Sequence, residues 1–141
     1  MSDEPPAHGN LLDTHIAIFS MKQSSSLSHA AKAAVARGPN FLSVIVYWEV
    51  MVKSMKGSLD VGDPRLWWFD ALDQLAATPL PLHPRHVATL QALPPFHKDP
   101  FDRMLIAQAV AGKLTLVTMD AEIARYASAG LRVVGREGIS A

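Results

Sequence analysis

Short apolar runs alternate with longer amphipathic stretches along this chain. This pattern is typical of strands and helices that take turns around a mostly parallel sheet. We expect strands near residues 11–12 and at residues 41–45, 114–117 and 131–134. Prolines interrupt residues 79–82, so this stretch is an edge strand at best. The pattern therefore predicts an α/β fold with four or five strands.

Caps, prolines and glycines mark the ends of the expected helices. The clearest helix has Asp99 at the capping position, Pro100 at the first helical position and Gly112 just past its end. Asp63 and Pro64 open another helix by the same rule. Helices are expected at residues 14–21, 24–38, 46–56, 64–76, 84–93, 100–111 and 120–129. Helical segments thus separate all the expected strands.

The composition is that of an ordinary folded domain, with 141 residues of which 49% are hydrophobic and 18% charged. We expect one domain over residues 1–141, with loose termini at residues 1–9 and 136–141. There is no cysteine, which excludes disulfides and thiolate metal sites. Packing must therefore supply the stability.

Positive and negative side chains balance, with 13 Lys and Arg against 13 Asp and Glu. A net charge of zero argues against binding nucleic acids or membranes by bulk electrostatics, and leaves room only for a local basic rim. The first ten residues lack a secretory signal, and the most apolar segment, residues 42–52, is too short to span a bilayer. We expect a cytoplasmic protein without membrane contact.

Acidic residues stand near the ends of the predicted strands. Asp13 follows the first strand, Glu49 lies within about a helical turn of the second, and Asp120 follows the fourth. Asp102 opens the helix before that fourth strand. Ligand sites of such sheets lie beyond the carboxyl ends of the strands, so these acids could face one crevice. Carboxylates that share a crevice repel one another and need a hard cation such as Mg²⁺ or Mn²⁺, which suits phosphodiester chemistry.

Each of these acids also has a structural interpretation. Asp13 and Asp120 are suited to cap helices, and Asp102 to the positive end of a helix dipole. Glu49 can pair with Lys53 one helical turn later. Spacing alone therefore leaves open whether the acids form a site.

Four segments carry more specific information, namely LLDTH (11–15), LSVIVYWEVMVKSMKGSL (42–59), LPPFHKDPFDRMLIAQA (93–109) and LVTMD (116–120). In order and spacing they resemble the PIN-domain ribonucleases, and among these the VapC-type toxins of bacterial toxin–antitoxin pairs. The run HKDPFDR at residues 97–103 is the most specific piece. The resemblance covers most of the chain.

The resemblance implies a three-layer α/β/α sandwich and a Mg²⁺- or Mn²⁺-dependent endoribonuclease. It places the acidic metal ligands at Asp13, Glu49, Asp102 and Asp120. Such an enzyme hydrolyses RNA phosphodiester bonds with a water that the metal activates. The alternative is a catalytically degenerate PIN domain that binds RNA or a protein partner without cutting. The intact acids favour the enzyme.

Other residues are expected to support the acids. Thr118 would position a carboxylate or a water, and Asp99 would cap a helix behind the ligands. Arg103 could clamp phosphate, or it could pair with Asp99 or Asp102. The site is thus expected to extend beyond its four acids.

The helix that carries Glu49 is where the chain departs from the family's pattern. Ser43 is retained, but Val46 stands where many relatives have a second serine. Lys53 on the same helix could add to a basic rim for RNA. The hydrogen bonds around Glu49 are therefore expected to differ from those of these relatives.

The resemblance also implies partners, namely RNA as substrate, a VapB-like antitoxin and a second copy of the chain in a homodimer. We interpret Trp67 and Trp68 as aromatics of such an interface. His83 and His86 are interpreted as exposed side chains rather than metal ligands. His97 lies beside the expected acids and could contact a substrate phosphate or an acid.

Overall fold

A five-stranded sheet forms the centre of the computed structural model, which describes residues 9–136. All neighbouring strands pair in parallel, in the order β3-β2-β1-β4-β5. The strands are β1 (Asn10–Leu12), β2 (Asn40–Ser43), β3 (Ala77–Leu80), β4 (Thr115–Val117) and β5 (Arg132–Val134). The α/β class and the parallel sheet predicted from the sequence are confirmed. The prediction of one domain over residues 1–141 stays a prediction.

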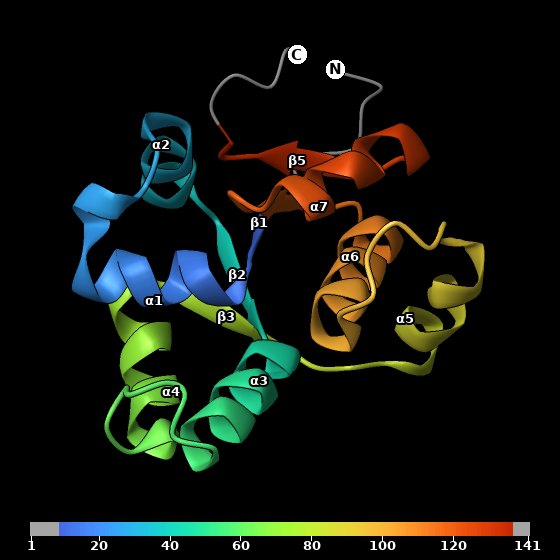
Figure 1. The fold of residues 1–141 in the computed structure, drawn as a ribbon. Helices are drawn as coiled ribbons and strands as arrows, with labels where there is room; N and C mark the ends of the chain where they lie inside the picture. Colours follow the sequence, from blue (N-terminus) through green and yellow to red (C-terminus); the bar gives the residue numbers. More distant parts are fainter. Residues whose placement is uncertain (1–8, 137–141) are drawn as a thin grey trace.

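Helices cover both faces of the sheet. They are α1 (Thr14–Lys22), α2 (His29–Arg37), α3 (Val44–Met55), α4 (Pro64–Gln74), α5 (Pro84–Thr89), α6 (Pro100–Gly112) and α7 (Ala121–Ala124). In Figure 1, α1, α2 and α4 lie to the left of β1 and β2, and α5 and α6 lie to the right. This is the expected α/β/α arrangement, which right-handed crossovers between parallel strands produce. No helix within residues 9–136 combines the length and apolar character needed to cross a membrane.

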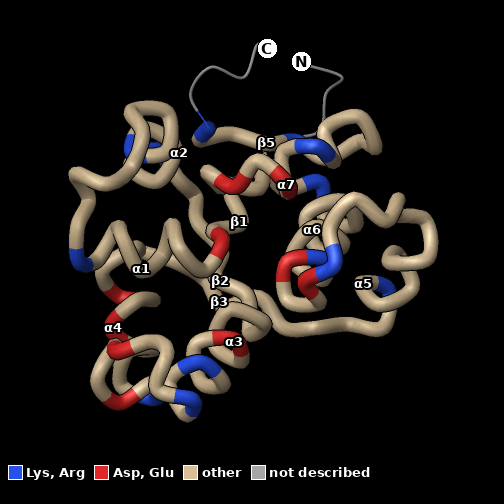
Figure 2. Tube along the Cα trace, in the orientation of Figure 1, with Lys and Arg blue, Asp and Glu red and all other residues tan. Residues whose placement is uncertain are grey.

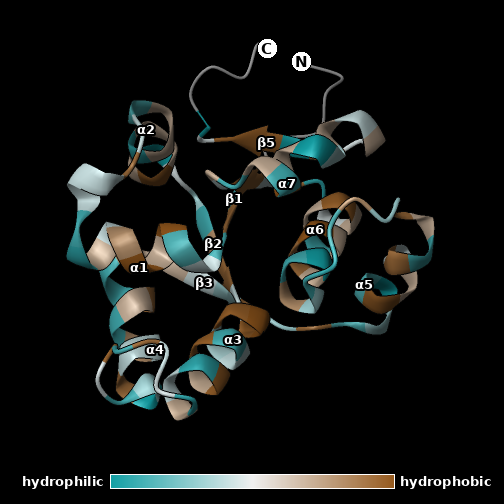
Figure 3. Cartoon of the chain, in the orientation of Figure 1, coloured by the Kyte–Doolittle hydropathy of each residue, from teal (hydrophilic) through white to brown (hydrophobic). Residues whose placement is uncertain are grey.

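The core is built around β1, the central strand. Leu11 and Leu12 are fully buried, and so are Leu42 of β2 and Leu116 of β4 beside them. Figure 3 shows hydrophobic colour along β1 and at the start of α3. A parallel strand covered by helices on both faces has no solvent side, which explains its unbroken apolar run. Asp13 and Thr14, which directly follow β1, are thereby attached to a rigid, buried strand.

Several elements differ in their bounds from the prediction. Strand β2 ends at Ser43, not at residue 45, because the Ser43 hydroxyl accepts a hydrogen bond from the backbone N–H of Ile45 at 3.0 Å and caps α3. The edge strand lies at Ala77–Leu80, two residues before the expected 79–82. The expected long last helix is the short α7 followed by a 3₁₀ turn at Arg125–Ala129.

The tryptophans of α4 belong to the core. Trp67 and Trp68 are only 6% and 7% exposed, and Tyr47 of α3 stacks on Trp68 with ring centroids 4.9 Å apart. Leu66 and Phe69 are instead 65% and 66% exposed. The interpretation of the two tryptophans as interface aromatics was therefore wrong, because α3 already covers this side of α4.

His86 is also buried, contrary to the sequence interpretation, with 1% of its surface exposed. Its Nδ1 accepts a hydrogen bond from the backbone N–H of His83 at 3.0 Å and lies 3.4 Å from Nε2 of Gln108. The Ser43 hydroxyl donates to Oε1 of Gln108 at 2.5 Å. Burial lowers the pKa of His86. These contacts join α5 and α6 to the end of β2.

The expected loose termini fall mostly on residues 1–8 and 137–141, which lie outside the described residues. Gly9 is described, and its carbonyl accepts a hydrogen bond from Thr115 at 3.0 Å. This contact extends the pairing between the first and fourth strands.

Candidate active site

Asp13 and Asp120 stand at the carboxyl ends of the neighbouring strands β1 and β4. Each caps the helix that follows: Asp13 accepts from the N–H of Ile16, and Asp120 from that of Glu122, both at 2.8 Å. The two aspartates line one pocket of about 260 Å³, together with His15, Ile16, Phe19 and Met119. Both aspartates therefore cap helices, as expected, and both also line the pocket.

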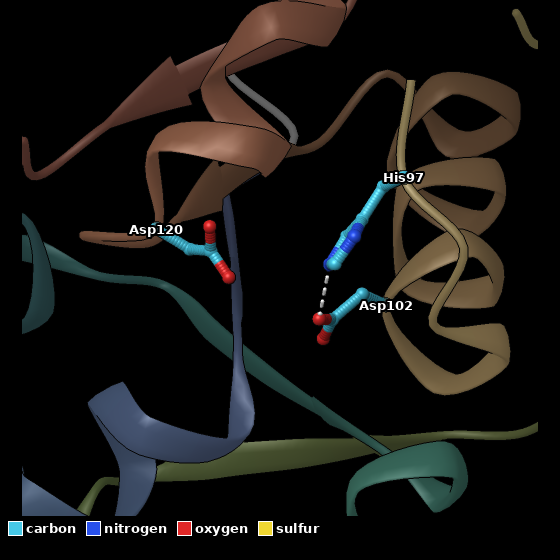
Figure 4. A group of neighbouring side chains, drawn as sticks. All are labelled: His97, Asp102 and Asp120. Atoms are coloured by element: carbon cyan, nitrogen blue, oxygen red, sulfur yellow. Dashed lines mark hydrogen bonds and ion pairs between the residues drawn. The ribbon is translucent and has the colours of Figure 1, made fainter. Parts of the chain in front are cut away.

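Asp102 comes from the opposite side, in the first turn of α6. Asp99 caps this helix by accepting from the N–H groups of Phe101 and Asp102 at 2.9 and 3.1 Å. The Nε2 atom of His97 lies 2.8 Å from Oδ2 of Asp102. Ligand atoms of His97, Asp102 and Asp120 lie within 4.8 Å of one another, and Figure 4 shows the three side chains pointing toward a common space.

Glu49 lies on α3 and is 3% exposed. The hydroxyl of Thr14 donates to its Oε1 at 2.5 Å, and Nζ of Lys53 pairs with its Oε2 at 2.6 Å. The expected pairing of Glu49 with Lys53 is therefore present, and it raises the pKa of Lys53. Thr14 supplies the hydroxyl near Glu49, while Val46 on the same helix as Glu49 is fully buried.

The electrostatics of the site disfavour bare carboxylates. Burial raises the pKa of Asp13 to about 6, against hydrogen bonds from Thr118 and Ile16 that lower it, and the charge of Asp102 adds to the rise. Burial also raises the pKa of Asp102 to about 6, with Asp99 and Glu49 adding to the effect and His97 opposing it. Both aspartates therefore feel neighbouring negative charge, which a bound cation would offset. Figure 2 shows the acidic positions at the end of β1 and at the starts of α6 and α7 around the middle of the molecule.

The donor set fits a divalent metal ion. Within the described residues, it offers one carboxylate oxygen each from Asp102 and Asp120 and one imidazole nitrogen from His97. Asp13 shares a pocket with Asp120 but, like Glu49, lies outside this group of three. Oxygen ligands suit Mg²⁺ and Mn²⁺, and imidazole suits first-row transition metals.

Thr118 ties two of the acids together. Its hydroxyl accepts from the N–H of Asp120 at 3.0 Å and hydrogen-bonds the side chain of Asp13. The backbone of Thr118 packs closely against Gly135, whose φ is +127°, and a Cβ at Gly135 would lie 2.6 Å from the carbonyl oxygen of Thr118. The expected role of Thr118 in positioning a carboxylate agrees with these contacts.

Among the described residues, the Arg103 guanidinium forms no ion pair with Asp99 or Asp102; only the backbone N–H of Arg103 bonds Asp99, at its carbonyl oxygen, 3.0 Å away. Its Nη1 donates to the carbonyl oxygen of Pro94 at 3.1 Å and to the Tyr126 hydroxyl at 3.0 Å. The expected pairing with Asp99 or Asp102 was therefore wrong, and Arg103 instead braces the loop before α6. Its role as a phosphate clamp stays a prediction. Ser43 likewise bonds Gln108 and caps α3, with no contact to Glu49 among the hydrogen bonds of the described residues.

Sequence reasoning missed two contributors, Thr14 and Tyr126. Thr14 directly follows Asp13, so its place beside the acids was readable, but its bond to Glu49 joins residues 35 positions apart. Tyr126 carries no local signal, since only the fold brings its hydroxyl to the loop at Pro94, 32 positions away. His97 contacts an acid, as one of its two interpretations expected.

The sequence is similar to a known domain family and to a bacterial ribonuclease. The PIN domain family model matches residues 11–129. Ribonuclease VapC22 of Mycobacterium tuberculosis (strain ATCC 25618 / H37Rv) is 30% identical over 112 residues, which cover 78% of this chain and 85% of that protein.

Solved structures with the same fold include toxin–antitoxin complexes. VapBC2 from Rickettsia felis, bound to a DNA fragment from its promoter, matches with a TM-score of 0.66 and 15% identity over 88% of this chain and 96% of that chain. VapBC-5 from Mycobacterium tuberculosis matches with a TM-score of 0.58 and 18% identity over 92% of this chain and 98% of that chain. At these identities the structures support the fold.

Proposed function

The chain belongs to the PIN domain family, and from this premise we propose that it is a metal-dependent endoribonuclease of the VapC toxin type. The observation that carries the proposal is the meeting of acids from separate segments. Asp13, Asp120 and Asp102 lie at one end of the sheet, and Glu49 is near enough to raise the pKa of Asp102. An aspartate that only caps a helix does not need other acids nearby, so capping alone does not explain this arrangement.

We assign Mg²⁺ or Mn²⁺ as the cofactor, held by Asp13, Asp102 and Asp120 with Glu49 beside them. Bound there, the ion would supply a Lewis acid that lowers the pKa of water and offsets charge on the attacked phosphate. Both oxygens of Glu49 already accept hydrogen bonds from Thr14 and Lys53. We therefore propose that Glu49 orients the attacking water, and that its negative charge helps to retain the cation.

The remaining side chains hold this arrangement. Thr118 fixes the relative positions of Asp13 and Asp120 through its single hydroxyl. Lys53, paired with Glu49 and partly exposed, provides a cation at the rim for the phosphate backbone of RNA. Asp99 starts α6 in the register that turns Asp102 toward the pocket side.

A water nucleophile determines the products. Because the ribose 2′-hydroxyl is not the attacking group, the purified protein with Mn²⁺ is expected to leave 5′-phosphate and 3′-hydroxyl ends on cleaved RNA. Mass spectrometry of the fragments measures the ends, and excess EDTA is expected to stop cleavage. Fragments that end in 2′,3′-cyclic phosphate would contradict the mechanism, and cleavage that persists in EDTA would indicate a contaminating nuclease.

We further propose a VapB-like antitoxin and a second copy of the chain as partners in the cytoplasm. The matched structures bear the names of VapBC complexes, which supports the antitoxin. Trp48 on α3 is 58% exposed and lines two apolar pockets of about 220 and 290 Å³, which supports self-association.

Two experiments test these partners. Light scattering is expected to give the mass of a dimer. The product of a neighbouring gene is expected to co-purify with this protein and to block cleavage. A monomer in light scattering counts against the second copy, and the lack of such a gene product counts against the antitoxin.

A further inference from the structure

We propose that His97 is itself a metal ligand, and that its imidazole makes the site selective for Mn²⁺ over Mg²⁺. The proposal deepens the proposed function and rests on it. The acids expected from the sequence form an oxygen-only set, and His97 changes the chemical character of that set.

The geometry places His97 among the acids. Its Nε2 atom and carboxylate oxygens of Asp102 and Asp120 lie within 4.8 Å of one another (Figure 4). Two ligands of one ion lie roughly 3–4 Å apart, because metal–ligand bonds are about 2.0–2.2 Å long. Small side-chain rotations therefore bring the three atoms to one ion, which would take the place of the present contact between His97 and Asp102.

The backbone of His97 is held from both sides. Its N–H donates to the hydroxyl of the buried Tyr126 at 3.0 Å, and its carbonyl oxygen lies 3.4 Å from Nη1 of Arg103. The Tyr126 hydroxyl in turn donates to the carbonyl oxygen of Pro94 at 2.7 Å.

Phe96 packs on Tyr126 with ring centroids 5.1 Å apart, which adds apolar support to the same loop. The loop thus holds the backbone of His97 in place, so that only a side-chain rotation is needed to bring its imidazole to an ion. Preorganisation of this kind is what a ligand position requires. It also explains why Arg103 and Tyr126 hydrogen-bond the loop that carries His97, although, within residues 9–136, neither contacts the acids through its side chain.

The nitrogen donor decides the metal. Mg²⁺ takes oxygen ligands almost exclusively and gives up its waters reluctantly, whereas imidazole binds first-row transition metals well. With only carboxylates, the site would bind either ion. With His97 added, Mn²⁺ gains a favourable bond that Mg²⁺ does not.

Electron paramagnetic resonance of Mn²⁺ bound to the full chain, without RNA, tests this directly. Wild type is expected to show ¹⁴N modulation of the electron spin echo from a coordinated imidazole. His97→Gln is the discriminating variant, because its amide can still donate a hydrogen bond to Asp102 but is a poor nitrogen ligand. Its ¹⁴N signal is expected to vanish, with Mn²⁺ affinity lower by about tenfold or more and Mg²⁺ affinity changed by less than about threefold.

His83→Gln serves as the matched control, because His83 is exposed and lies outside the cluster. It is expected to keep both the ¹⁴N signal and the Mn²⁺ affinity of wild type, and circular dichroism checks the fold of each variant. Mn²⁺ bound without ¹⁴N coupling, and with equal affinity in His97→Gln, overturns the proposal and reduces His97 to a hydrogen-bond partner of Asp102. Nitrogen-coupled binding without RNA cleavage would instead count against the proposed function alone.

Discussion

Asp102→Asn is expected to lower the rate of RNA cleavage by about 10²–10³-fold or more, with the protein still folded. The substitution keeps the size of the side chain and removes the charge of an acid that lies beside both His97 and Asp120. Loss of a charge-stabilising contact in the transition state is worth several kcal/mol, and each 1.4 kcal/mol is about tenfold in rate. Initial rates on a structured RNA with saturating Mn²⁺ measure the effect.

Asp70→Asn provides the control, because Asp70 is an exposed acid on α4. Its cleavage rate is expected to match that of wild type. An Asp102→Asn protein that keeps more than a tenth of the wild-type rate would remove Asp102 from the metal site. A wild-type protein that binds RNA but fails to cut it with any divalent metal would favour the alternative of a degenerate PIN domain.

Asp13→Asn is expected to stabilise the metal-free protein at pH 7.5 by about 1–3 kcal/mol. Burial raises the pKa of Asp13 from 3.8 to about 6, so the folded protein holds this proton more tightly than the unfolded chain does. The cost of ionising Asp13 is therefore fully present above about pH 6 and disappears as the pH falls toward 4. Asparagine avoids this cost and can still accept the hydrogen bond from Ile16 that caps α1.

Urea unfolding in EDTA at pH 4.5 and 7.5 measures this prediction. The gain from Asp13→Asn is expected to shrink at pH 4.5, and added Mn²⁺ is expected to stabilise wild type but not the variant. Asp63→Asn is a control of opposite sign, because Arg65 lowers the pKa of Asp63, the cap of α4. That variant is expected to lose stability. If Asp13→Asn also loses stability, with or without metal, Asp13 is a cap and nothing more.

Local signals were sufficient for most secondary structure. Asp99, Pro100 and the glycine at the far end bounded α6 correctly to within a residue, because capping and proline geometry depend only on adjacent backbone. Ser43 shows where such signals conflict: strand and helix patterns overlap at residues 43–46, and its capping hydroxyl decides in favour of the helix. The error was one of boundaries, and the element itself was predicted.

Burial on the helices was harder to predict than their existence. Trp67 and Leu66 are adjacent, yet Trp67 is buried and Leu66 exposed. The difference depends on where α3 packs against α4, which places Tyr47 over Trp68. His86 is a similar case, since Gln108 reaches it from another helix. Neither partner is near in the sequence, so no local pattern predicts the contact.

The sequence by itself determined the alternation of strands and helices, the family, and the four candidate acids, because these depend on short-range periodicity and on motifs within single segments. Only the tertiary structure decided which of those acids share a space, that Thr14 bonds Glu49, and that Arg103 braces a loop rather than a carboxylate. The physical reason is that these contacts join distant residues, such as Thr14 with Glu49 35 positions away and Arg103 with Tyr126 23 positions away, and their distances are set by packing and not by neighbours in the chain.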